Sequence, residues 1–138
     1  MKSDEIVGAV GFSVMSIRPG DSALAMGLGD LPIAATSHFL NLMESASLTV
    51  INDYLEPGET TRLISMELEV FDAVSIGSEI RAAARCTQVL GKEIFIDCDI
   101  YNGERHVATA KMKRATVERV SFLARTAAQS IVEQLPQN

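Results

Sequence analysis

Glu44 is the side chain whose surroundings most strongly indicate chemistry. It lies within a stretch of apolar residues at helical spacing, which predicts a helix from Thr36 or Ser37 to Leu55. The apolar stripe of this helix contains Phe39, Met43, Ala46, Val50 and Tyr54. A carboxylate beside such a stripe costs free energy unless it is paired, hydrogen-bonded or used in a reaction. Glu44 is therefore either a nucleophile or general base, or a helix residue hydrogen-bonded at a subunit boundary.

Thr36 places a hydroxyl at the start of the same helix. A threonine in this position is commonly only an N-cap, but it can also orient a reacting group. The backbone N–H groups of a helix start can stabilise an oxyanion. Glu56-Pro57-Gly58 ends the helical pattern. One helix thus carries both candidate catalytic residues.

The rest of the chain has the two-residue period of β-strands. A first strand is expected over residues 6–16, and residues 27–32 form a loop. After the helix, strands are expected over residues 60–74, 79–89, 93–101 and 104–117, with a closing helix at about 121–135. We interpret this order as a strand, a long helix and a four-stranded antiparallel meander in one domain, residues 1–138. A long central helix wrapped by a curved antiparallel sheet, an α+β fold, buries the apolar faces of both.

Asn102-Gly103 predicts a two-residue type I′ turn, which would pair Asp99 with His106. That register conflicts with the apolar pattern, because it places Lys111 opposite Ile94. Two explanations remain open: a β-bulge shifts the last strand, or both faces of the sheet are partly covered, as at a dimer interface.

The arrangement resembles the hotdog fold, and its motifs resemble the fluoroacetyl-CoA thioesterase type over roughly residues 30 to 122. The motifs are Ala35-Thr36, Leu42-Met43-Glu44 and the run Tyr54-Leu55-Glu56-Pro57-Gly58-Glu59. The resemblance implies a homodimer with active sites at the subunit interface. Such enzymes hydrolyse acyl-CoA or acyl-carrier thioesters with a Thr, a Glu and a His, and need no cofactor beyond the CoA of the substrate.

By position, the family's Thr and Glu correspond to Thr36 and Glu44, whereas its His corresponds to Val70 and a strand glycine to Leu63. Valine cannot hold a proton. His38 lies roughly 120° around the helix from Glu44, and His106 belongs to the outer hairpin. Val70 and Leu63 either reline an acyl pocket or are ordinary core residues.

Two functions are compatible with a valine at the position of the family's histidine. A carboxylate can hydrolyse a thioester alone, by direct attack or by activating water, because the thiol leaving group ionises near pH 8–9. We therefore expect a thioester hydrolase that depends on Glu44. The alternative is a non-catalytic protein that binds an acyl thioester or another small ligand.

Composition excludes several other classes. A net charge of −6 argues against nucleic acid as a partner, although local cations can still hold CoA phosphates or form a solvated face. The candidate cations are Arg62, Arg81, Arg85, Lys111, Lys113 and Arg114. No apolar run approaches the roughly 20 residues of a membrane span, and no signal peptide is evident, so a cytoplasmic location is expected. Cys86 and Cys98 are expected to be buried thiols, and no spacing of Cys and His predicts a metal site.

Overall fold

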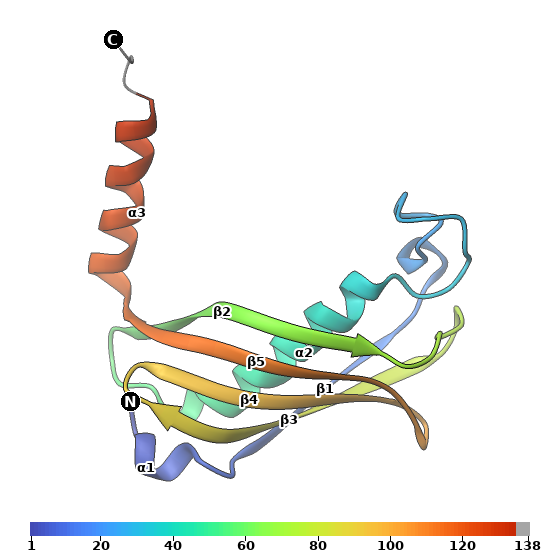
Figure 1. Ribbon diagram of the computed structural model, residues 1–138, viewed down its shortest axis with the longest axis horizontal. Helices are drawn as coiled ribbons and strands as arrows, with labels where there is room; N and C mark the ends of the chain where they lie inside the picture. The colour runs from blue at the N-terminus through green and yellow to red at the C-terminus, as the bar shows by residue number, and fades with distance from the viewer. Residues whose placement is uncertain (135–138) are drawn as a thin grey trace.

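The computed structural model describes residues 1–134, and its elements follow the expected order (Figure 1). The helices are α1 (Ser3–Ile6), α2 (Thr36–Ile51) and α3 (Arg119–Glu133), with short 3-10 turns η1 (Pro19–Asp21) and η2 (Asn52–Tyr54). The strands are β1 (Val10–Ser16), β2 (Glu59–Val70), β3 (Glu79–Leu90), β4 (Glu93–Asn102) and β5 (Arg105–Glu118). Leu135, the expected last residue of the closing helix, lies outside the described residues.

Three expected boundaries shift. The first strand begins at Val10 rather than at Ile6, because Ile6 ends α1, and Gly8, with φ +90°, separates α1 from β1. The regular part of α2 ends at Ile51 and continues as η2. β2 ends at Val70 rather than at residue 74, and the carbonyl of Val74 accepts a hydrogen bond from Ala34 N–H outside the sheet.

The five strands form one antiparallel sheet in the order β1-β3-β4-β5-β2. The expected four-stranded meander was wrong for β2, which pairs with β5 at the opposite edge from β1. Tight turns join β3 to β4 and β4 to β5, whereas residues 71–78 connect β2 to β3. These residues can extend roughly 26 Å, which exceeds the roughly 14 Å across three strand spacings. The connection is therefore long enough to pass the ends of two strands.

The β4–β5 hairpin corrects the expected turn. Asn102 pairs with Arg105, so the loop residues are Gly103 and Glu104. Only Gly103 has a positive φ, of 62°, whereas a type I′ turn requires it at both central positions. A glycine at the first central position is the requirement of a type II′ turn. The predicted type I′ turn was therefore wrong by one residue.

A bulge between Ile100 and Tyr101 resolves the conflict in the register. It places Ala108, Ala110 and Met112 opposite Ile100, Cys98 and Ile96, respectively. All six of these side chains are buried. Of the two explanations left open by the sequence, the bulge is the one confirmed.

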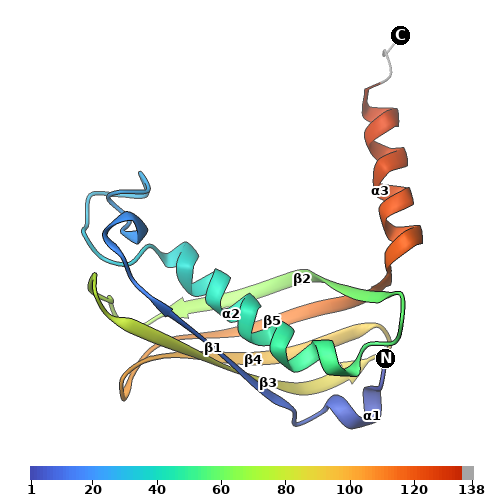
Figure 2. The ribbon, with the colours of Figure 1, turned by 180° about the vertical axis from the view of Figure 1, so that it is seen from behind.

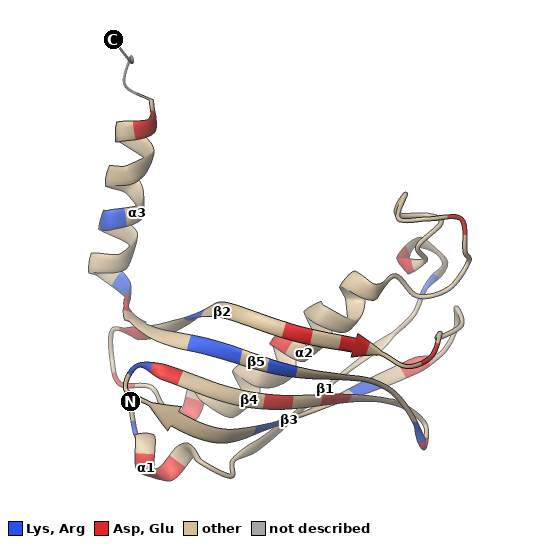
Figure 3. Ribbon diagram, viewed as in Figure 1, with Lys and Arg blue, Asp and Glu red and all other residues tan. Residues whose placement is uncertain are grey.

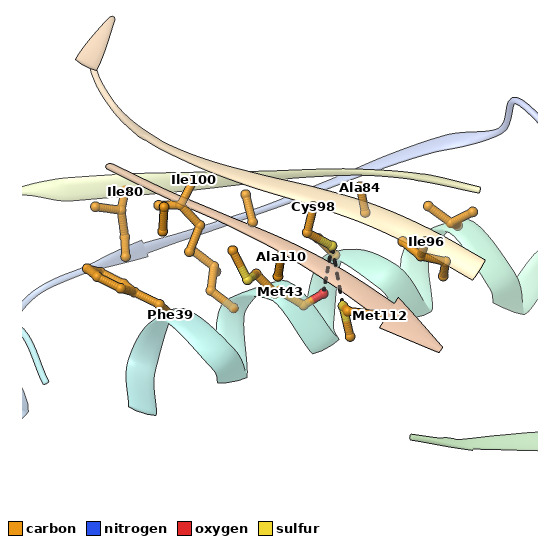
Figure 4. Packing of buried hydrophobic residues seen from close by; sticks show 14 of the residues in the cluster. Phe39, Met43, Ile80, Ala84, Ile96, Cys98, Ile100, Ala110 and Met112 are labelled. Atoms are coloured by element: carbon orange, nitrogen blue, oxygen red, sulfur yellow. Dashed lines mark hydrogen bonds between the residues drawn. The ribbon is translucent and has the colours of Figure 1, made fainter. Parts of the chain in front are cut away.

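Helix α2 lies across the face of the sheet that curves around it and contacts β1, β3 and β4 (Figure 2). Phe39 and Met43 face the sheet among isoleucine, alanine and sulfur-containing side chains (Figure 4). Cys98 Sγ lies 3.8 Å from the Met43 carbonyl oxygen and 3.4 Å from Met112 Sδ. Burial, and then the charges of neighbouring Asp99 and Asp97, raise the pKa of Cys98 to about 12. Cys86 is also a free buried thiol, as predicted.

The approach of β1 to α2 is close at Gly11. A Cβ on this residue would lie 2.1 Å from Thr49 Oγ1, 2.8 Å from the Ala46 carbonyl oxygen and 2.9 Å from Val50 Cγ2. Only a glycine leaves room for the helix at this height above the strand.

Helix α3 extends from the end of β5 and stands away from the rest of the molecule (Figure 1). Its Val120, Leu123 and Ile131 are 72%, 56% and 63% exposed. Throughout residues 1–134, no helix combines the length and hydrophobicity needed to cross a membrane.

Candidate functional site

Glu44 is ion-paired with Arg114 of β5. Arg114 Nη1 lies 3.1 Å from Glu44 Oε1, and the two side chains are 7% and 34% exposed, respectively. Arg114 Nε also donates to Thr61 Oγ1 at 3.0 Å, and Nη2 donates to the Thr61 carbonyl oxygen at 3.4 Å. A buried guanidinium requires such partners. Within residues 1–134, Glu44 Oε2 accepts no hydrogen bond, so one carboxylate oxygen is fixed and the other is unengaged.

The role of Arg114 is the feature that the sequence reasoning missed. Arg114 was considered only as a surface cation for phosphate, but its side chain is buried and its guanidinium faces α2. The alternation of buried and exposed residues along β5 could have indicated that Arg114 is buried, once the position of the bulge is known. Ala108, Ala110 and Met112 point inward, and Arg114 is the next residue in that series.

Thr36 is exposed and is the first residue of α2. The N-cap position belongs to Ala35, and no side chain of residues 1–134 caps the helix, so the N-cap interpretation of Thr36 was wrong. The first N–H groups of an α-helix have no intrahelical acceptor. Among the described residues, the N–H groups of Thr36 and Ser37 bond no other backbone carbonyl. The start of α2 therefore presents unused donors.

One cleft beside Thr36 is formed by residues 17–35, which we call the cap segment. This segment folds back on itself through the bridge between Ser22 and Ala34. The cleft between it and the start of α2, here the cap cleft, has a volume of ≈ 380 Å³. It is lined by Thr36, Ser37, Leu28, Leu31 and Ile33, among others. Ser37 Oγ is buried in this region without a hydrogen-bond partner in the described chain.

A second cleft, the strand-end cleft, has a volume of ≈ 360 Å³ and brings Thr36 together with Val70. Val70 is 42% exposed and lies at the end of β2, opposite Ala108 on the face toward α2. Leu63 is paired with Arg114 and packs against the core.

The four predicted site residues therefore form two groups. Thr36 lies with Val70, whereas Glu44 and Leu63 both lie beside Arg114. Thr36 and Glu44 are eight residues apart on one helix, a separation of roughly 12 Å along its axis. One copy of the chain does not bring them into contact.

Neither histidine replaces the missing one. His38 Nε2 lies 3.1 Å from Met26 Sδ and 3.5 Å from Asp21 Oδ1, so it faces the cap segment. His106 is paired with Tyr101 in the hairpin, and its Nε2 lies 2.8 Å from Asp99 Oδ1. The expectation that both face away from Glu44 is confirmed.

The lysines of β5 lie between acidic residues of the two neighbouring strands; Figure 3 shows the cationic segments of β5 with acidic segments on β4 and β2. Lys111 is paired with Glu67 of β2 and with Asp97 of β4. Lys113 Nζ lies 3.7 Å from Glu93 Oε2. This is a charge-balanced solvated face. Within the described part of the chain, no group of three or more His, Cys, Asp or Glu side chains could hold a metal ion.

The helix and its five-stranded sheet place the protein in the hotdog class, as predicted. A mutant of the fluoroacetyl-CoA thioesterase FlK in complex with acetyl-CoA superposes with TM-score 0.81 at 19% identity, covering 89% of this chain and 97% of the other. A thioesterase superfamily member from Thermus thermophilus gives TM-score 0.86 at 18% identity, covering 93% and 95%. A hot-dog-like protein from Thermanaerovibrio acidaminovorans gives 0.81 at 17% identity, covering 100% of both chains.

The model of the family FlK, fluoroacetyl-CoA-specific thioesterase, matches residues 17–137. The chain therefore belongs to this family of hotdog acyl-CoA thioesterases. Among curated protein sequences, no significant match is found.

Proposed function

We propose that this protein hydrolyses an acyl thioester of CoA or of an acyl carrier, with Glu44 as the reacting carboxylate and without the family's histidine. The observation that carries this proposal is the asymmetry of Glu44. Arg114 fixes its Oε1, while Oε2 accepts no hydrogen bond from residues 1–134 and the side chain is 34% exposed. A carboxylate needed only as a counter-ion could turn both oxygens toward the guanidinium in a bidentate pair, whereas Glu44 contacts Arg114 through Oε1 alone.

Two reaction routes fit this geometry. In the first, Oε2 takes a proton from water, the resulting hydroxide adds to the thioester carbonyl, and the C–S bond breaks to release a thiolate and the acid. In the second, Oε2 adds to the carbonyl carbon and the C–S bond breaks, which releases the thiolate and leaves a mixed anhydride. Water then hydrolyses the anhydride to the acid and the free Glu44 carboxylate. The unused N–H groups at the start of α2 support the developing oxyanion, and Thr36 orients the reacting group.

We also propose that the working unit is a homodimer. Thr36 and Glu44 lie too far apart on one helix to touch the same thioester, so a site that uses both draws them from two copies. β2 supports this arrangement, because no strand of residues 1–134 pairs with its outer edge and its Ile64 and Val70 are 39% and 42% exposed. Twofold pairing at this edge would create two equal sites.

The test is thiol release from a panel of short-chain and long-chain acyl-CoAs and acyl-pantetheines. A hydrolase gives saturable turnover with at least one acyl group. The rival, a binding protein, is favoured by Val70 at the position of the histidine and by the ion pair that already engages Glu44. Saturable binding of an acyl-CoA with no release above background would establish the rival and reject hydrolysis.

Val70→His should raise kcat with little change in KM, because the strand-end cleft has room for the ring beside Thr36. General acid–base groups contribute about 10²-fold or more when well placed. The variant should also acquire a rate dependence near pH 6.5. Val70→Gln is the matched control, since it adds a polar group that does not titrate. A rate unchanged from wild type in Val70→His would show that the site does not use a base at this position.

A further inference from the structure

A hollow of ≈ 400 Å³ lies where α3 leaves the sheet, and we call it the α3-base pocket. Its charged and aromatic lining consists of Arg62, Lys92, Glu118, Phe122 and Arg125. Arg62 is paired with Ala115 on the face of the sheet turned away from α2. The pocket is thus separate from the two clefts at the start of α2.

Three cations without a carboxylate partner line this one pocket. Within residues 1–134, Arg62, Lys92 and Arg125 form no ion pair. Other cations, such as Arg18 and Arg81, also lack an ion pair in the described chain, but they lie outside this lining. All three unpaired cations are exposed. Figure 3 shows cationic segments of β2, the β3–β4 turn and α3 at this end of the molecule. A chain of net charge −6 therefore gathers three cations and one carboxylate, that of Glu118, at one hollow, which gives the hollow a net positive charge.

The one carboxylate in the lining is already engaged. Glu118 Oε2 accepts from Ser121 N–H at 2.7 Å and Oε1 accepts from Val120 N–H at 3.2 Å, which caps α3. These bonds, chiefly the one from the Ser121 backbone, lower the pKa of Glu118. Its oxygens face the helix end, so they do not neutralise the three cations directly.

Phe122 holds the two guanidinium groups in place. The Cζ atoms of Arg62 and Arg125 lie 5.9 Å and 5.6 Å from the centre of its ring. A guanidinium on an aromatic ring keeps its N–H donors directed outward, where they can form paired hydrogen bonds to phosphate oxygens. The position of Lys92 is set by its carbonyl, which accepts from Thr116 N–H at 2.8 Å.

We propose that the α3-base pocket binds the phosphate groups of a nucleotide-sized organic phosphate. Its volume exceeds that of a single phosphate, and its cations suit an ester that carries more than one. Two sources share this chemistry: the nucleotide end of the CoA substrate, in which case the inference rests on the proposed function, and a free nucleotide that binds independently of turnover.

The test is calorimetric titration of the full chain with adenosine 3′,5′-bisphosphate, the nucleotide part of CoA, and with AMP and inorganic phosphate. We expect saturable binding that weakens with added salt and falls about tenfold or more in the double variant Arg62→Gln/Arg125→Gln. Arg119→Gln removes one positive charge from α3 outside the lining, as Arg125→Gln does within it, and should bind as wild type. Circular dichroism melting of each variant confirms that it is folded.

Enzyme kinetics and ligand preference distinguish the two sources of the phosphate, CoA and a free nucleotide. If CoA is the ligand, the double variant raises KM for acyl-CoA but not for the matching acyl-pantetheine. If a free nucleotide is the ligand, both KM values stay unchanged while binding of AMP is lost. No saturable binding by wild type, or equal binding by wild type and the double variant, would overturn the proposal. The titration needs no turnover, so its result is independent of whether hydrolysis occurs.

Discussion

Glu44→Gln should lower kcat/KM for thioester hydrolysis by about 10²–10⁴-fold, the usual contribution of a general base. The amide oxygen of glutamine can still accept the hydrogen bond that Arg114 Nη1 gives at 3.1 Å, so the fold should be retained. The variant loses the second carboxylate oxygen, Oε2, which in the wild type can take a proton or attack a carbonyl. Steady-state thiol release, with the best acyl group from the substrate panel, measures the effect.

Glutamine is preferred to alanine for a physical reason. Alanine would leave the buried guanidinium of Arg114 without its carboxylate, which costs about 3–5 kcal/mol for a buried pair and would confuse folding with catalysis. Glu69→Gln is the matched control, because Glu69 is exposed on β2 opposite Thr109. Activity of Glu44→Gln close to that of the Glu69→Gln control would mean that Glu44 serves only as the counter-ion of Arg114.

Gly11→Ala should destabilise the fold strongly, by about 3 kcal/mol, at the upper end of the cost of overpacking. Rotation of Thr49 could relieve the 2.1 Å contact, but the 2.8 Å contact is with the backbone carbonyl of Ala46. The helix itself must therefore move away from β1. Urea denaturation measures the change in the free energy of unfolding.

Gly20→Ala is the control for this change. Gly20 has open space around its Cβ position and its φ is not positive, so alanine there should change stability by less than about 0.5 kcal/mol. Thr49→Ala combined with Gly11→Ala should recover only part of the loss, because the Ala46 carbonyl remains. Stability of Gly11→Ala equal to that of Gly20→Ala would show that β1 and α2 are not packed this closely.

The helix and the inner face of the sheet follow from periodicity alone. α2 buries residues at the spacing seen in its sequence, so its start and its stripe could be predicted. Sheet order is less accessible, because the place of β2 beside β5 depends on a crossing connection rather than on any strand pattern. The hairpin register was misjudged for two reasons. The turn lies at Gly103-Glu104, one residue later than predicted, and the bulge between Ile100 and Tyr101 leaves no distinct mark in composition.

For the site, sequence identified which residues to examine but not their partners. The pairing of Glu44 with Arg114 joins residues 70 positions apart, and it depends on the bulge that turns Arg114 inward. The cluster of Arg62, Lys92 and Arg125 likewise draws on three elements that only the fold brings together. Such contacts arise from tertiary structure, and no local pattern encodes them.

The central claim is that Glu44 of one copy acts on a substrate held at Thr36 of another. The direct measurement is the activity of purified heterodimers formed from Thr36→Ala and Glu44→Gln chains that carry different affinity tags. Each parent homodimer should be impaired, whereas the heterodimer retains one intact site and should recover about half of the wild-type rate. A heterodimer no more active than the mean of its parents, or a wild-type protein that is fully active as a monomer, would contradict the account.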